Sequence, residues 1–254
     1  MNWITNVIMA VASALLASGA QGKITLHEPN YFTFGYVDQV NTSVAVEGEH
    51  GEYQGMKNTE AKFQFSLKFP LFEQRDRAIM GAFTQTSFWQ LGNTDRSSPF
   101  RDSNYRPELF SLHHVSRRLS VSQGYRHQSN GRGGALSRSW ERYFLAMHFD
   151  TGSWGMTLQG WHAFALSDNP DISHFIPPWQ LDVNVPIGRG EWAVTGAYGG
   201  PASRGFIETS VTHPLTHDLA VFAQYRSGYG DSLLDYRTRN TRITLGFRLF
   251  PSRF

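Results

Sequence analysis

The sequence predicts an all-β fold, a transmembrane antiparallel β-barrel of about twelve strands. Three observations favour it. Short segments throughout the chain alternate apolar and polar residues with a period of two, the pattern of strands with unlike faces. Beyond residue 20, no apolar stretch is long enough for a membrane-spanning helix. Aromatic residues form 14% of the chain and often lie near the ends of the alternating segments, as in the interfacial girdles of membrane proteins.

The N-terminal segment has the features of an export signal. Val7 to Ala17 is almost wholly apolar, and Ser18-Gly19-Ala20 supplies a small-x-small cleavage site, although no Lys or Arg precedes the apolar run. We therefore expect residues 1–20 to be a signal peptide. The remaining residues, 21–254, contain no low-complexity linker and are expected to form one barrel domain.

The alternating segments define the expected strands in order along the chain. They lie near 31–37, 62–69, 79–90, 109–127, 139–150, 154–166, 179–186, 191–199, 205–212, 219–225 and 242–249. Tight turns are expected at 70–73, 150–153 and 188–190, and long polar loops at 91–107 and 128–138.

The last segment shows why the strands indicate a barrel. Ile243, Leu245 and Phe247 alternate with Arg242, Thr244 and Arg248, and a face that carries arginines cannot form a packed core. A secreted β-sandwich, which buries its apolar faces against each other, is the alternative.

Composition excludes several classes of function. Cysteine is absent, so any metal must be held by oxygen or imidazole ligands. The formal net charge is only +2, with Lys and Arg dispersed, so nucleic acid is not expected as a partner.

One expected strand carries a candidate catalytic pair. His127 and Ser129 are two residues apart, so on a strand their side chains face the same way, with a base beside a nucleophile. Their odd-numbered face also holds Tyr125 and Val121 and is the more apolar face. In a barrel the pair would therefore face lipid. An isolated His-x-Ser is common, so the pair alone would be weak evidence of catalysis.

The next expected strand supports this interpretation. Glu141 shares an odd-numbered apolar face with Tyr143, Leu145 and Met147. Glu141 could therefore lie beside His127 and orient the imidazole as the third member of a triad.

With these residues in view, the chain resembles the outer-membrane phospholipase A family. The resemblance is carried by His127-Gln128-Ser129-Asn130-Gly131-Arg132 and extends from about residue 60 to the end. Further matching motifs are Ser97-Ser98-Pro99-Phe100-Arg101, Asn104-Tyr105-Arg106-Pro107-Glu108, Ser137-Arg138-Ser139-Trp140, Asp168-Asn169-Pro170-Asp171 and Ser227-Gly228-Tyr229-Gly230. The resemblance implies a twelve-stranded barrel in the outer membrane of a Gram-negative bacterium. It also implies hydrolysis of phospholipid acyl esters at either glycerol position, and of lysophospholipids.

The resemblance also implies roles for individual residues. Ser129 would be the nucleophile, His127 its base, and the Gly131 N–H a donor to the oxyanion. A calcium cofactor would be bound by the Arg132 carbonyl, the Ser137 hydroxyl and the Ser97 carbonyl of a second subunit. The active form would then be a homodimer, with Gln85 matching a polar residue in its interface.

Two departures from the family pattern limit what can be carried over. The best-known members have asparagine at the position of Glu141. A further calcium site in the family uses acidic groups at positions matching Gly134 and Asp168, and Gly134 offers none. We therefore expect this second site to be weak or absent. Two rival functions remain open, namely a passive pore or structural barrel and a relative that has lost catalysis.

Overall fold

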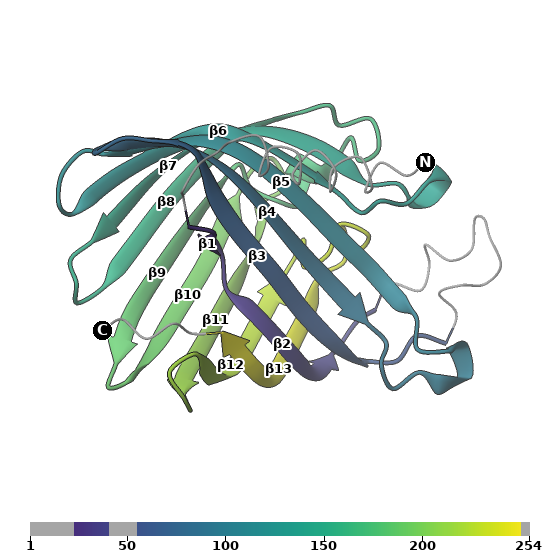
Figure 1. Cartoon of the computed structure of the whole chain (residues 1–254). Helices are drawn as coiled ribbons and strands as arrows, with labels where there is room; N and C mark the ends of the chain where they lie inside the picture. Colours follow the sequence, from purple (N-terminus) through teal and green to yellow (C-terminus); the bar gives the residue numbers. More distant parts are fainter. Residues whose placement is uncertain (1–22, 41–54, 250–254) are drawn as a thin grey trace.

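The computed structural model describes residues 23–40 and 55–249. In this part of the chain, twelve long strands form a closed antiparallel barrel, preceded by the two-residue strand β1 at Thr25–Leu26 (Figure 1). The long strands are β2 (Asn30–Val37), β3 (Thr59–Glu73), β4 (Arg77–Trp89), β5 (Phe100–His114), β6 (Leu119–Ser129), β7 (Ser139–Asp150), β8 (Gly155–Phe164), β9 (Trp179–Ile187), β10 (Gly190–Gly199), β11 (Arg204–Pro214), β12 (Leu219–Gly228) and β13 (Asn240–Leu249). The predicted barrel is therefore confirmed, and the expected signal peptide lies outside the described residues.

The barrel closes because each strand pairs with its neighbours in sequence and β2 also pairs with β13. In the part of the chain that the structure describes, no long strand keeps a free edge, which removes the unpaired backbone groups that lipid cannot satisfy. Strand β1 pairs with the same edge of β3 as β2 does. The two strands are separated by an interruption that includes Pro29, which has no N–H to donate. Asn30 bridges this interruption, since its Nδ2 donates to the Ser66 carbonyl at 2.8 Å and its Oδ1 accepts from the Ser66 N–H at 2.7 Å.

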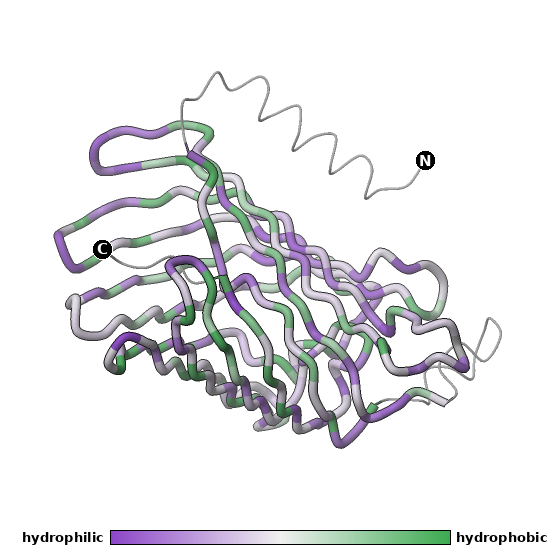
Figure 2. The backbone as a smooth tube through the Cα atoms, turned by 60° about the horizontal axis from the view of Figure 1, so that its bottom comes forward, coloured by the Kyte–Doolittle hydropathy of each residue, from purple (hydrophilic) through white to green (hydrophobic). Residues whose placement is uncertain are grey.

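The two faces of the wall are those of a membrane barrel. Outward-facing side chains such as Leu145, Ile243 and Leu245 are 54–61% exposed, whereas inward-facing Arg126 and Arg242 are buried. Figure 2 shows the resulting alternation of hydrophobic and hydrophilic residues along the strands. This distribution rules out the sandwich alternative. Among the described residues, no helix has the length and apolar character needed to cross a membrane.

Two expected boundaries were wrong. The segment 109–127 is two strands, because the chain reverses between β5 and β6, where the Val115 N–H donates to the Leu119 carbonyl at 2.9 Å. The expected loop at 91–107 ends earlier, since β5 begins at Phe100. Asp102 and Asn104 are buried on the inner face of β5. Because a strand that lines a polar lumen carries polar residues, its sequence resembles that of a polar loop.

The connections differ between the two ends of the barrel. Short turns join β3 to β4, β5 to β6, β7 to β8, β9 to β10 and β11 to β12. The other end carries the longer connections 90–99, 130–138, 165–178 and 229–239. Outer-membrane barrels have short periplasmic turns and long extracellular loops, so the second end is extracellular.

The extracellular loops close the mouth of the barrel. Leu233 and Tyr236 of the 229–239 loop pack with Ile172 of the 165–178 loop and with Trp140 of β7 in one buried cluster. The Leu233 N–H donates to Asn104 Oδ1 on β5 at 2.9 Å. The loop joins β12 to β13, on the wall opposite β5 and β7, so it crosses the lumen to make these contacts.

Candidate active site

The candidate catalytic residues lie on adjacent strands at the extracellular end of the barrel wall. His127 and Ser129 end β6, and they pair directly across the sheet with Glu141 and Ser139 of β7. Since facing residues of an antiparallel pair point to the same side, all four side chains share the outer face. The local sequence dictates this arrangement, because the 130–138 connection joins β6 directly to β7 and both strands alternate with a period of two.

The imidazole of His127 is held by the carboxylate of Glu141. Its Nδ1 lies 2.6 Å from Glu141 Oε1, and both side chains are less than one fifth exposed. A carboxylate can only accept, so this bond places the proton on Nδ1 and leaves Nε2 as the basic nitrogen. The hydroxyl of Tyr125 donates to the other carboxylate oxygen of Glu141. Glu141 is thereby fixed from two sides.

The candidate nucleophile is enclosed and its hydroxyl has no hydrogen-bond partner among the described residues. Ser129 is 7% exposed. Below the His127–Glu141 pair, toward the middle of the wall, Tyr125, Tyr143 and Phe164 form an aromatic patch whose rings lie 4.8 to 6.4 Å apart between centroids. A hydroxyl above an apolar patch suits an ester group carried at the end of an acyl chain.

The loop that follows Ser129 is organised by Asn130. Its buried side chain accepts from the backbone N–H groups of Arg132 (3.3 Å) and Arg138 (3.0 Å) and donates to the Leu136 carbonyl (2.9 Å). Gly131, next to it, has φ 66°, the left-handed region that favours glycine. The loop thus holds its backbone groups in fixed positions beside Ser129.

Oxygen donors gather on the other side of this loop. Asp168 Oδ2 accepts from the hydroxyls of Ser137 (2.7 Å) and Ser139 (2.9 Å). The Ser139 N–H donates to Asn169 Oδ1 at 3.0 Å and attaches the 165–178 loop to the site. A hydroxyl beside a carboxylate, close to the carbonyls of a fixed loop, matches the all-oxygen ligand sets of calcium.

The structure places Ser97 and Gln85 apart from this group, whereas the Gly134 carbonyl accepts from the Ser137 N–H at 3.1 Å. Ser97 is exposed, has φ 57°, and ends the 3-10 turn Thr94–Arg96 in the loop between β4 and β5. Within the described residues, no hydrogen bond joins it to Ser137. Gln85 is half-buried on β4 and donates to Ser87 Oγ at 3.1 Å. Gly134 opens the 3-10 turn Gly134–Leu136.

A second cluster of possible metal ligands lies inside the barrel. Ligand atoms of His27, Glu28 and Glu108 lie within 4.8 Å of one another. Both carboxylates, however, are already paired with guanidinium groups, since Arg106 binds Glu28 and Arg126 binds Glu108 at 2.8 Å. Their negative charge is therefore compensated without a metal ion.

The sequence does not reveal the contacts of three contributors to the site. Tyr125 was assigned only to the apolar face, although a tyrosine two positions before His127 could have been recognised as a neighbour of Glu141. Asn130 was noted only as part of a motif. Asp168 is matched by the resemblance to a further calcium site, but no local signal connects it with Ser137, which lies 31 positions away.

Comparison with known proteins assigns the chain to a family. The model of the Phospholipase A1 family matches residues 11–249. The chain is 33% identical over 233 residues to Phospholipase A1 of Escherichia coli K12 and 35% identical to that of Proteus vulgaris, in each case covering 88% of this chain and 80% of the relative.

Solved structures support the same family assignment. The outer membrane phospholipase of Salmonella typhi, crystallised as a dimer with bound calcium, superposes with a TM-score of 0.85 at 30% identity, covering 90% of this chain and 93% of the other. Outer membrane phospholipase A of Escherichia coli superposes with a TM-score of 0.84 at 30% identity, covering 90% and 99%. The chain belongs to the Phospholipase A1 family and is an outer-membrane phospholipase of a Gram-negative bacterium.

Proposed function

We propose that this phospholipase hydrolyses acyl esters of phospholipids and lysophospholipids, at both glycerol positions, through a Ser129–His127–Glu141 mechanism that depends on calcium. The observation that carries the proposal is the bond of 2.6 Å between His127 and Glu141 on the lipid-facing side of the wall. An oriented base beside a serine, outside the barrel, can reach only substrates that arrive from the membrane.

In the first half of the reaction, Ser129 Oγ attacks the ester carbonyl carbon while His127 Nε2 takes the hydroxyl proton. The Glu141 carboxylate stabilises the imidazolium that forms. The tetrahedral intermediate then collapses, the C–O bond to the glycerol oxygen breaks, and Nε2 returns the proton to that oxygen. The acyl chain remains attached to Ser129.

In the second half, a water molecule replaces the glycerol alcohol. Nε2 removes one proton from the water, the resulting hydroxide attacks the acyl carbon, and Ser129 leaves with the proton. A fatty acid is released and the site returns to its starting state. The Gly131 N–H would donate to the oxyanion in both halves, since donors placed beforehand at that position are worth several kcal/mol.

Calcium suits the oxygen donors next to this loop. The Arg132 carbonyl and the Ser137 hydroxyl would hold the ion, and Asp168, bonded to that hydroxyl, adds negative charge nearby. When bound, calcium would supply positive charge for the developing oxyanion. Gly134 supplies no carboxylate, so a second calcium site is not part of the proposal.

A homodimer would complete the set of calcium ligands. Ser97 is exposed on a different loop from Ser137, and its carbonyl would be supplied by a second copy of the chain. The related Salmonella typhi protein crystallised as a dimer with bound calcium, which supports the same assembly here. Half-buried Gln85 would lie in that interface.

The structure counts against the rival function of a passive pore. The loop 229–239 crosses the lumen, and buried ion pairs join its Asp235 to Arg101, and Arg101 to Glu60 at 2.8 Å. Channels of barrel proteins are open and polar, whereas here the extracellular end is filled.

One assay tests the proposal. The purified protein is given a phospholipid in detergent, with calcium or with a chelator, and compared with Ser129→Ala. Release of fatty acid that requires both calcium and Ser129 is the expected result. Unchanged release of fatty acid by Ser129→Ala would contradict a mechanism in which Ser129 is the nucleophile.

A further inference from the structure

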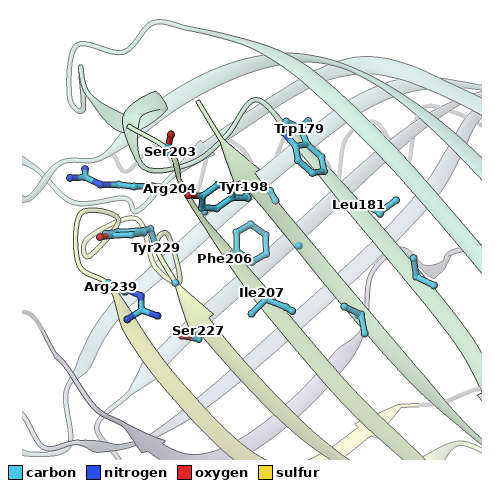
Figure 3. A pocket seen from close by; sticks show the side chains of 16 residues that line it. Trp179, Leu181, Tyr198, Ser203, Arg204, Phe206, Ile207, Ser227, Tyr229 and Arg239 are labelled. Carbon is cyan, nitrogen blue, oxygen red and sulfur yellow. The ribbon is translucent and has the colours of Figure 1, made fainter. Parts of the chain in front are cut away.

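A groove lies on the outer face of strands β9 to β12, near the extracellular end (Figure 3). Its volume is about 640 Å³, within the range of small-molecule sites. It exists because large and small side chains face each other across the strands, where Tyr198 pairs with Gly205 and Ile207 pairs with Gly196 and Ser227. A Cβ at Gly205 would lie 1.9 Å from the Ala197 carbonyl oxygen, so a side chain cannot fill this hollow.

Two arginines lie at the loop end of this groove (Figure 3). The Cζ of Arg204 lies 4.2 Å from the ring centroid of Phe175 and 5.3 Å from that of Tyr229. Stacking occupies the faces of a guanidinium and leaves its N–H edge for another ligand. Arg239 is exposed.

Neither arginine has a carboxylate partner among the described residues, unlike Arg237, which binds Asp171 at 2.8 Å. Within the described part of the chain, the groove therefore ends in two guanidinium groups that no carboxylate binds. Guanidinium groups favour phosphate because two parallel N–H donors match its oxygens.

We propose that this groove holds a phosphate-bearing lipid of the outer leaflet. Its acyl chain would lie against Leu181, Val183 and Val194, and its phosphate would bind Arg204 and Arg239. The position of the groove along the barrel matches the headgroup region of the outer leaflet. The long loops mark the extracellular side, and Trp179 and Tyr198 lie at the same end, where aromatic residues meet the headgroups (Figure 3).

The groove is a holding site and is separate from the candidate active site. Among the described residues that line it there is no histidine, aspartate or glutamate, so none of them offers a lipid a catalytic base. Strands β7 and β8 separate it from β6, which carries Ser129. Its occupant is therefore distinct from the substrate, and the proposal does not rest on the catalytic mechanism.

The test measures lipid retention by native mass spectrometry. The probes are a dialkyl ether phosphatidylglycerol, which has no ester to cleave, and a dialkylglycerol of the same chains without phosphate. We expect the wild type to retain the phosphate lipid about tenfold more strongly, equivalent to ~1.4 kcal/mol. The double variant Arg204→Gln/Arg239→Gln should lose most of this preference. The control Arg75→Gln/Arg189→Gln, which removes two charges from turns at the opposite end, should keep it.

A second pair of variants tests the apolar part. Ser227→Leu fills the groove and should lower retention of both lipids about fivefold or more. Ala223→Leu, on the same face of β12 but outside the groove, should not. Heat-dependent migration in electrophoresis confirms that each variant is folded. Equal retention of the two lipids by the wild type, or unchanged retention in the arginine double variant, would overturn the proposal. So would a dimer that forms through this face and is abolished by Ser227→Leu.

Discussion

Replacing Glu141 with alanine tests the orientation of the base. The change removes the acceptor 2.6 Å from His127 Nδ1, a hydrogen bond to a charged group that contributes about 1.5–3 kcal/mol. If that bond acts mainly in the transition state, kcat/KM should fall roughly 10- to 150-fold. The strands pair through their backbones at this position, so the barrel should remain intact.

Two companion variants separate orientation from charge and packing. Glu141→Asn keeps an acceptor oxygen on the same strand position and should retain substantial activity. Tyr125→Phe removes only the bond to the other oxygen of Glu141, so its loss should be much smaller than that of Glu141→Ala.

The assay is initial-rate hydrolysis of a short-chain phospholipid above and below KM, with calcium saturating. Heat-dependent migration serves as the folding control. A Glu141→Ala enzyme with wild-type kcat/KM would remove Glu141 from the triad. A Glu141→Asn enzyme as impaired as Glu141→Ala would show that the negative charge, rather than an acceptor oxygen, is required.

Four further outcomes are expected. Ser129→Ala should lower kcat by roughly 10⁴-fold or more without altering heat-dependent migration, because members of a catalytic triad act as a unit; residual activity near wild type would contradict the assignment. Chelation should abolish most activity, and Ser137→Ala should raise the calcium concentration needed for half-maximal rate, as followed by calcium titration. Asn130→Ala removes three hydrogen bonds of the 130–138 loop, at about 1 kcal/mol each. Its kcat should fall clearly while the denaturant midpoint of unfolding changes little, as measured by initial rates and by denaturant titration. Arg101→Met leaves Glu60 and Asp235 without this buried partner and should destabilise the barrel by about 3–5 kcal/mol, measured by unfolding in guanidinium.

The sequence alone was sufficient to predict the wall of the barrel and the two faces of its strands. Period-two alternation sets which side chains face lipid, so the outward direction of His127, Ser129 and Glu141 could be predicted before any contact was known. The 130–138 connection joins β6 directly to β7, and this hairpin brings His127 and Glu141, only 14 positions apart, into one cross-strand pair. Strand limits were less predictable. The polar inner face of β5 resembled a loop because a lumen accepts the same residues as solvent.

Only the tertiary structure decided what the loops and the closed wall bring together. Asp168 reaches Ser137, and the 229–239 loop reaches Asn104 on β5 across 129 positions, because closure of the barrel sets its loops around one mouth. No periodicity encodes such contacts, since they depend on the register of every intervening strand. The groove over β9 to β12 has the same origin. Its small and large residues lie on four strands, and they form a hollow only where cross-strand pairing sets Gly205 opposite Tyr198.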